Sequence, residues 1–132
     1  MLREYEMTFI TRSDLPEADF NGVLAKYEKY MTSDGGEILK KEAWGSRKLA
    51  FPINKQHRGN FMVYDFAGLA SHLTEMERLM RIDENVLRYL SVLINKQVDI
   101  EKRKDEIVKE AAAAKEREAA AREAAEELGG RD

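Results

Sequence analysis

The stretch REYEMTFIT, residues 3–11, decides the fold because its apolar and polar residues alternate one by one. In an extended chain Tyr5, Met7 and Phe9 point to one side, while the two glutamates and Thr8 point to the other. A period of two is typical of a strand with one buried face. The sequence therefore predicts that the domain begins with such a strand.

From residue 20 the apolar positions change to the three- and four-residue spacing of a helix face. Pro16 before this segment and Gly35-Gly36 after it fit the two ends of a helix. The same spacing returns over residues 69–81. The sequence thus predicts two amphipathic helices, with apolar positions at Phe20, Val23, Leu24, Tyr27 and Met31 in the first and at Leu69, Leu73, Met76 and Met80 in the second.

Two strand-like runs lie between these helices. Residues 37–53 are rich in aliphatic and aromatic residues, but Gly45 interrupts them, which favours a long bulged strand. Pro52 predicts an edge position, because proline cannot donate a ladder hydrogen bond. The polar residues 54–59 predict a turn, and residues 61–66 are again aromatic and β-branched, so the two runs predict a hairpin.

A last β-branched and aromatic run, residues 86–94, completes the order strand, helix, strand, strand, helix, strand. This order predicts an α+β, ferredoxin-like βαββαβ fold, in which two helices cover one face of a four-stranded antiparallel sheet. We expect residues 1–95 to form this domain. The uncovered face and the sheet edges are then the expected contact surface.

Residues 96–132 form a charged C-terminal extension rich in alanine and glutamate. Its composition favours helix, but it has almost no apolar stripe to pack against a partner. We expect a helical or disordered tail that contributes little to assembly.

The composition excludes several classes of protein. With no cysteine among 132 residues, the chain can have no disulfide and no thiolate site, which suits a cytoplasmic protein. Its start carries charges where a signal peptide needs an apolar run, and no apolar segment is long enough to span a membrane. The net charge of −3 lacks the basic excess of a free-standing nucleic-acid binder, so RNA contacts must come from local clusters.

No arrangement of residues predicts an enzyme, a metal site or a cofactor. His57 and His72 have no partners at ligand spacing, and a surface histidine is the simpler interpretation. The glutamates of residues 3–11 lack a nearby nucleophile or oxyanion donor. Gly35-Gly36 precedes a strand, whereas a phosphate-binding loop would open a helix.

The most RNA-like patch is Trp44-Gly45-Ser46-Arg47-Lys48, which places two cations beside an aromatic residue. Lys55 and Arg58 follow across the predicted hairpin. On a strand, Arg47 and Lys48 point to opposite faces, so they can divide between a phosphate and a protein partner. Ordinary solvated charges remain an equally good interpretation of this patch.

Arg58-Gly59 and the aromatic residues after it are similar to the RNP1 strand of RNA-recognition motifs, whose rings stack on bases. The match slips by one residue at Asn60. The first strand also offers no aromatic residue on its free side. These aromatic residues are therefore better interpreted as core and hairpin packing.

Several motifs together resemble one family, the sixth protein of the bacterial small ribosomal subunit. The resemblance covers residues 2–94 and rests on Tyr5-Glu6, Gly36, the run Trp44-Gly45-Ser46-Arg47-Lys48-Leu49-Ala50-Phe51-Pro52-Ile53, Gly59, Phe61, Arg81-Ile82 and Asn85-Val86-Leu87-Arg88-Tyr89. It implies a ferredoxin-like fold and a structural role in the cytoplasmic ribosome. It also implies binding to the central domain of the small-subunit rRNA, jointly with the eighteenth small-subunit protein.

Carried over residue by residue, the resemblance implies two sets of contacts. The RNA contacts fall on Arg3, Arg47, Lys48 and Arg88, with Lys55 and Arg58 in the turn as weaker candidates; the partner surface is formed by Trp44, Leu49 and Phe51. Relatives often have a lysine near the end of the last strand, where this chain has Leu93-Ile94-Asn95.

Two alternatives on the same fold remain. A single-stranded RNA-binding module would bind RNA without a partner. A regulatory domain would bind a small ligand at its sheet edges or loops.

Overall fold

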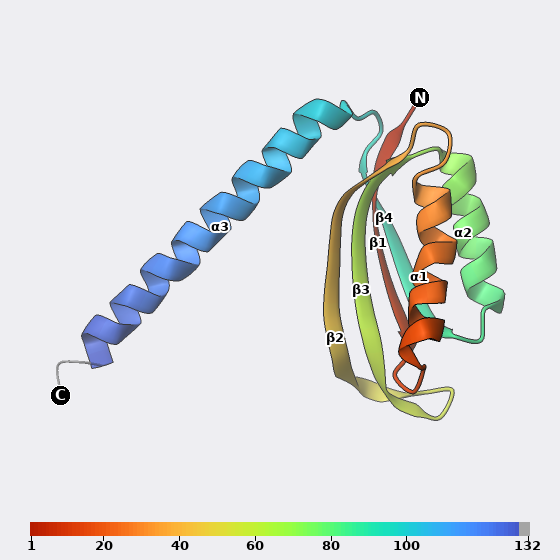
Figure 1. Ribbon diagram of the computed structural model, residues 1–132, viewed down its shortest axis with the longest axis horizontal. Coiled ribbons are helices and arrows are strands. Elements are labelled where there is room, and N and C mark those ends of the chain that lie inside the picture. The colour runs from red at the N-terminus through yellow and green to blue at the C-terminus, as the bar shows by residue number, and fades with distance from the viewer. Residues whose placement is uncertain (130–132) are drawn as a thin grey trace. The chain divides into compact units, whose positions relative to one another are not determined.

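The computed structural model describes residues 1–129, which form an antiparallel sheet, two helices packed on it and a third helix (Figure 1). The chain divides into two compact units between Ile100 and Glu101, and the sheet belongs to the first. In chain order the elements are β1 (Arg3–Arg12), α1 (Glu17–Met31), β2 (Glu37–Ile53), β3 (Gln56–Gly68), α2 (Ala70–Ile82), β4 (Val86–Asn95) and α3 (Ile100–Gly129).

The strand order is β2-β3-β1-β4, so β1 and β3 are the central strands. Each neighbouring pair is antiparallel. Helices α1 and α2 cover the same face of the sheet, as Figure 1 shows. This confirms the predicted ferredoxin-like fold, and it explains the alternation in residues 3–11, because only one face of β1 meets the helices.

The core lies between the covered face and the two helices. Met7 and Phe9 on β1 are fully buried, as are Tyr64 and Phe66 on β3. The centre of the Phe9 ring lies 5.8 Å from that of Tyr64 and 5.7 Å from that of Tyr27 on α1. Burying one apolar side chain of this size contributes roughly 1.5–3 kcal/mol, so this cluster holds the helices to the sheet.

The β2–β3 hairpin has a tighter turn than the sequence predicts. Residues 56–59, predicted as part of the turn, belong to β3. Only Asn54 and Lys55 connect the strands, and their φ angles of 47° and 66° are the left-handed values of a type I′ turn. The prediction of a longer turn was wrong because strands at the end of a hairpin are solvated and need no apolar residues.

Strand β2 is an edge strand, as Pro52 predicts. Its register against β3 shifts between Ala43 and Gly45, and Gly45 has a φ of 77°. The predicted interruption at Gly45 is therefore a bulge. A bulge bends the strand and changes the direction of the side chains beside it.

A carboxylate anchors α1 to the loop before β4. The Tyr27 hydroxyl donates a hydrogen bond of 2.7 Å to Asp83, the Lys26 ammonium donates one of 3.2 Å, and the Asn85 amide donates one of 2.9 Å. Burial raises the pKa of Asp83, but the three hydrogen bonds outweigh burial and hold that pKa below its usual value. They therefore stabilise the fold above a pH of about 4, and their contribution is lost as the pH falls through the lowered pKa.

Helix α3 is almost entirely exposed, with Val108 67% accessible. Ion pairs join Arg103 to Glu106 at 3.1 Å and Arg122 to Glu118 at 3.7 Å. Such exposed pairs contribute only about 0.2–0.5 kcal/mol each, so the helix depends mainly on the propensity of its alanine-rich sequence. Among residues 1–129, no helix is long and apolar enough to cross a membrane.

Replacing Gly36 with alanine should destabilise the domain, because the new methyl group would collide with the backbone oxygen of Met31 and lie 3.0 Å from that of Ala67. We expect a loss of about 2 kcal/mol. Gly22→Ala on α1 is the matched control, since no atom outside its own stretch of helix lies within 4 Å of the added methyl group and alanine should stabilise the helix by about 0.5–1 kcal/mol. Chemical denaturation measures both changes, and equal stability of the two variants would contradict this account.

Asp83→Asn should lower the free energy of unfolding by about 2 kcal/mol near neutral pH, because an amide oxygen is a weaker acceptor than a carboxylate. The wild type loses the same contribution when Asp83 is protonated, so the two proteins should converge in acid. Denaturation near pH 7 and near pH 3 tests this. A difference that stays constant between these pH values would show that the charge of Asp83 stabilises nothing.

Candidate RNA and partner interface

The sheet face not covered by α1 and α2 is called the open face below. The register places Ile10 of β1 beside Phe61 of β3 and Arg88 of β4. Two residues earlier, Thr8 pairs with Val63 and with Leu90. Directly paired residues share a face of a sheet, so the open face carries a largely apolar band that runs from β3 across β1 to the edge strand β4.

The bulge in β2 brings Trp44 onto this band. The Trp44 ring stacks on Phe61, with 6.4 Å between ring centres and 9° between planes, and its indole donates a hydrogen bond of 3.1 Å to Glu42. The guanidinium of Arg47 lies 4.9 Å from the centre of the Trp44 ring. Because Trp44 is 45% exposed, this cluster is available to a partner.

A second aromatic and cation pair joins the hairpin to the opposite edge strand. Phe51 of β2 is 56% exposed, and the guanidinium of Arg88 on β4 lies 5.1 Å from its ring centre. Leu49, between the two aromatic positions, is only 8% exposed. Of the three residues predicted to meet a partner, Trp44 and Phe51 are therefore accessible in this conformation and Leu49 is packed within the chain.

The other face of the hairpin carries a pair of like charges. Lys48 is paired directly with Arg58, and Arg47 is paired with Gly59, so Arg47 and Lys48 lie on opposite faces. Arg58 donates hydrogen bonds of 3.0 Å to the Ser46 hydroxyl and to the Ser46 backbone oxygen. Two cations directly across a ladder repel each other, and an anion between them would remove that repulsion.

Five of the six predicted RNA residues thus lie on the hairpin or on the edge strand β4, whose Arg88 contacts Phe51 of the hairpin: Arg47, Lys48, Lys55, Arg58 and Arg88. Arg3 does not join them. It is exposed at the start of β1 and pairs with Gly68, whereas Arg12 at the other end of β1 pairs with Gly59. The two ends are nine residue steps apart along the strand, a distance of about 30 Å.

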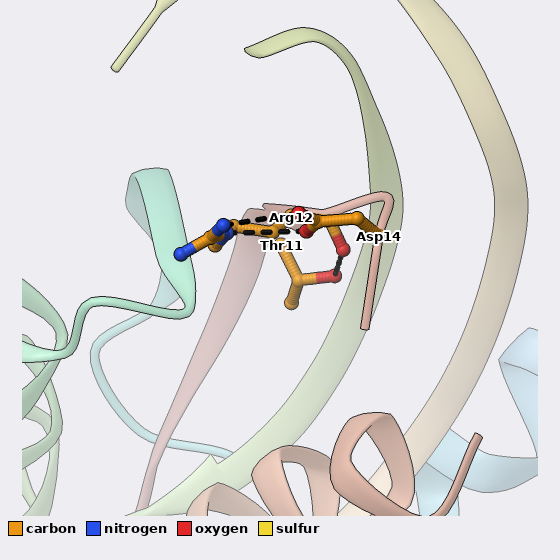
Figure 2. A network of polar contacts seen from close by, with 3 residues as sticks. All are labelled: Thr11, Arg12 and Asp14. Atoms are coloured by element: carbon orange, nitrogen blue, oxygen red, sulfur yellow. Dashed lines mark hydrogen bonds and ion pairs between the residues drawn. The ribbon is translucent and has the colours of Figure 1, made fainter. Parts of the chain in front are cut away.

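Arg12 is near the hairpin but is held by its own loop. Figure 2 shows its guanidinium directed at Asp14, with hydrogen bonds of 3.1 Å and 3.0 Å to the two carboxylate oxygens. The hydrogen bond from Arg12 holds the pKa of Asp14 below its usual value. The Arg12 guanidinium therefore binds the Asp14 carboxylate in this structure and does not present these two donors to a phosphate group.

The uncovered face was the expected contact surface, but its apolar residues on β1, β4 and the middle of β3 were not among the residues predicted to meet a partner. On β4, Leu90 is 64% exposed and Val92 is 43% exposed, and on the central strands Ile10 pairs with Phe61 on the same face. The sequence does indicate an apolar open face on β4, because residues 86–94 are apolar at both odd and even positions. A strand with one solvated face would alternate.

Neither histidine forms a metal site in the described chain. His72 lies 2.9 Å from the carboxylate of Asp34, which is one partner and not a ligand set. Within residues 1–129, no group of three or more His, Cys, Asp or Glu side chains lies close enough together to hold a metal ion.

A sequence model described as "Ribosomal protein S6" matches residues 4–93. The chain belongs to the ribosomal protein S6 family. Family membership makes it a structural, RNA-associated protein of the cytoplasmic ribosome that takes part in translation, and not an enzyme. The resemblance seen in the sequence motifs is thereby confirmed.

Individual relatives agree with this family. The small ribosomal subunit protein bS6 of Geobacter metallireducens is 41% identical over 97 residues, 74% of this chain and 82% of that protein. The protein of the same name from Desulfatibacillum aliphaticivorans is 36% identical over 108 residues, 82% of this chain but only 58% of the relative. The crystal structure of 30S ribosomal protein S6 from Thermotoga maritima superposes with a TM-score of 0.65 at 27% identity, covering 81% of this chain and 98% of that one.

Proposed function

We propose that this member of the S6 family is a structural constituent of the small ribosomal subunit that binds the central domain of its rRNA together with the eighteenth small-subunit protein. The observation that carries the proposal is the open face, where exposed aromatic residues and arginines adjoin. The relatives named above are small-subunit proteins, which supports the choice of subunit.

The basic residues of the hairpin and β4 are proposed to contact RNA phosphates. Arg47 and Arg88 lie on the open face, and Lys48 and Arg58 lie on the opposite face of the hairpin. Because the net charge is −3, the chain as a whole does not attract RNA, and only this local cluster of cations does. A basic partner would have to supply further phosphate neutralisation. Arg3, at the far end of β1, would reach a separate part of the RNA.

The apolar part of the open face is proposed to bind the partner protein. Exposed side chains from β2 to β4, namely Trp44, Phe51, Leu90 and Val92, lie on this face. Contiguous apolar surface of this kind marks a protein contact. Leu49 would take part only by supporting Phe51 from below or after a local rearrangement of the hairpin.

A second candidate function is single-stranded RNA binding by the chain alone. The exposed stack of Trp44 on Phe61 favours it, because bases stack on such rings. Tyr64 and Phe66, the other aromatic residues of the RNP1-like run, are fully buried and unable to do this. Binding without the partner distinguishes this function from the first.

The Arg47→Ala, Lys48→Ala double variant should bind a central-domain rRNA fragment more weakly in the presence of the eighteenth protein. Two lost phosphate contacts should reduce the slope of log affinity against log salt by about 2. The matched control is Lys29→Ala, Arg78→Ala, which removes two cations from α1 and α2. Filter binding or calorimetry over a salt series measures both.

Tight wild-type binding only with the partner, weakened in the double variant and unchanged in the control, is the expected result. Equal binding with and without the partner would favour the single-stranded RNA module. If no RNA binding occurs under either condition, the proposed function is wrong.

We also propose that residues 1–95 are the ribosomal domain and that residues 96–132 are dispensable for assembly. The amide of Val98 donates a 3.2 Å hydrogen bond to the Leu2 oxygen, so the end of the sheet has one backbone contact beyond Asn95. Two truncations, after Asn95 and after Ile100, separate this contact from α3.

Both truncated chains should enter small subunits as the wild type does, and the shorter one should be less stable by about 1 kcal/mol. Quantitative mass spectrometry of purified subunits and chemical denaturation measure these outcomes. Loss of both chains from the subunit would show that α3 is required. Loss of the shorter chain alone would place the domain boundary after residue 95.

A further inference from the structure

Two arginines expected to bind RNA lie on two aromatic rings expected to bind protein. Arg47 contacts the ring of Trp44 at 4.9 Å, and Arg88 contacts the ring of Phe51 at 5.1 Å. Both rings are about half exposed, so water still covers much of each pair. In each of these two pairs, a residue of the proposed RNA-binding surface therefore contacts a residue of the proposed partner-binding surface.

A guanidinium uses different parts of its surface for these two contacts. Its flat face stacks on a ring, while its five N–H groups point outward in its plane and remain free to donate to a phosphate. A partner that covers the ring removes water from the pair and strengthens the attraction between cation and ring. The arginine then loses mobility before RNA arrives, and its later immobilisation by RNA costs less.

We propose that the Arg47–Trp44 and Arg88–Phe51 pairs couple the binding of the partner protein to the binding of RNA. A partner seated on the rings raises the affinity for RNA by fixing the arginines with their donors outward. This proposal rests on the proposed function and adds the residues that transmit its cooperativity. By thermodynamic linkage, RNA must raise the affinity for the partner by the same factor.

The other cations of the hairpin provide an internal comparison. Arg58 is held by Ser46, and Lys48 faces Arg58 across the ladder. Lys26 and Lys41 also contact rings, those of Tyr27 and Tyr64, but neither ring is among the residues proposed to bind the partner. Lys48 should therefore add to RNA affinity without adding to the coupling.

The experiment measures a coupling factor, the dissociation constant for the rRNA fragment without the eighteenth protein divided by that with saturating partner. The full-length chain is used throughout. Phe51→Leu keeps an apolar side chain but removes the ring, and Arg88→Lys keeps the charge but removes the flat face. Each should reduce the coupling factor by about fivefold to tenfold while changing RNA affinity without partner far less.

Combining the two substitutions should reduce the coupling factor little further, because both break the same pair.

Two control variants should have different effects. Lys48→Ala should weaken RNA binding equally with and without partner. Val92→Ala, an exposed open-face residue without a cation, should weaken partner binding and leave the coupling factor at saturation unchanged.

A coupling factor that is large in the wild type and equally large in Phe51→Leu and Arg88→Lys would overturn this inference and leave the proposed function intact. Independent, additive losses in the double variant would also overturn it, because they exclude a shared pair. A wild-type chain that binds RNA in neither condition would overturn the proposed function together with this inference.

Discussion

The packing of Phe9 against Tyr64 and Tyr27 is the interaction on which the rest of the structure depends. It joins the two central strands to each other and to the first helix, with ring centres 5.7–5.8 Å apart. Because Met7 and Phe9 must face the helices, every second residue of β1 is directed to the other side. The open face is therefore a consequence of the core, and its position follows from the same alternation.

A ferredoxin-like sheet with helices on one side leaves its second face to be covered by something else. In this chain that face is apolar at its centre, with Phe61 and Ile10 on the central strands and Leu90 on β4. The bulge at Gly45 adds Trp44 to it from the edge strand. A protein with a net charge of −3 can serve an RNA particle with such a surface, because a local cluster of cations such as Arg47, Lys48 and Arg58 attracts phosphates even where the net charge does not.

Most of the fold could be predicted from sequence, because the elements of the core differ in period. The alternation over residues 3–11 and the helical spacing from Phe20 to Met31 each correspond to an observed element. The hairpin turn was predicted too long, since Gln56 to Gly59 are polar in sequence yet paired in β3. Solvated strands lack the apolar pattern from which strands are recognised.

The sequence by itself determined the element order, the covered face of β1, the edge position of β2 and the family motifs around Trp44 and Arg88. Only the tertiary structure decided which of the candidate residues meet. Strand β3 and helix α2 separate Phe51 from Arg88 in the chain, yet the Arg88 guanidinium lies 5.1 Å from the Phe51 ring centre, while Arg3 is far from the other cations. Periodicity reports the direction of a side chain relative to its own element. Contacts between distant elements depend on strand register and sheet twist, which no local pattern encodes.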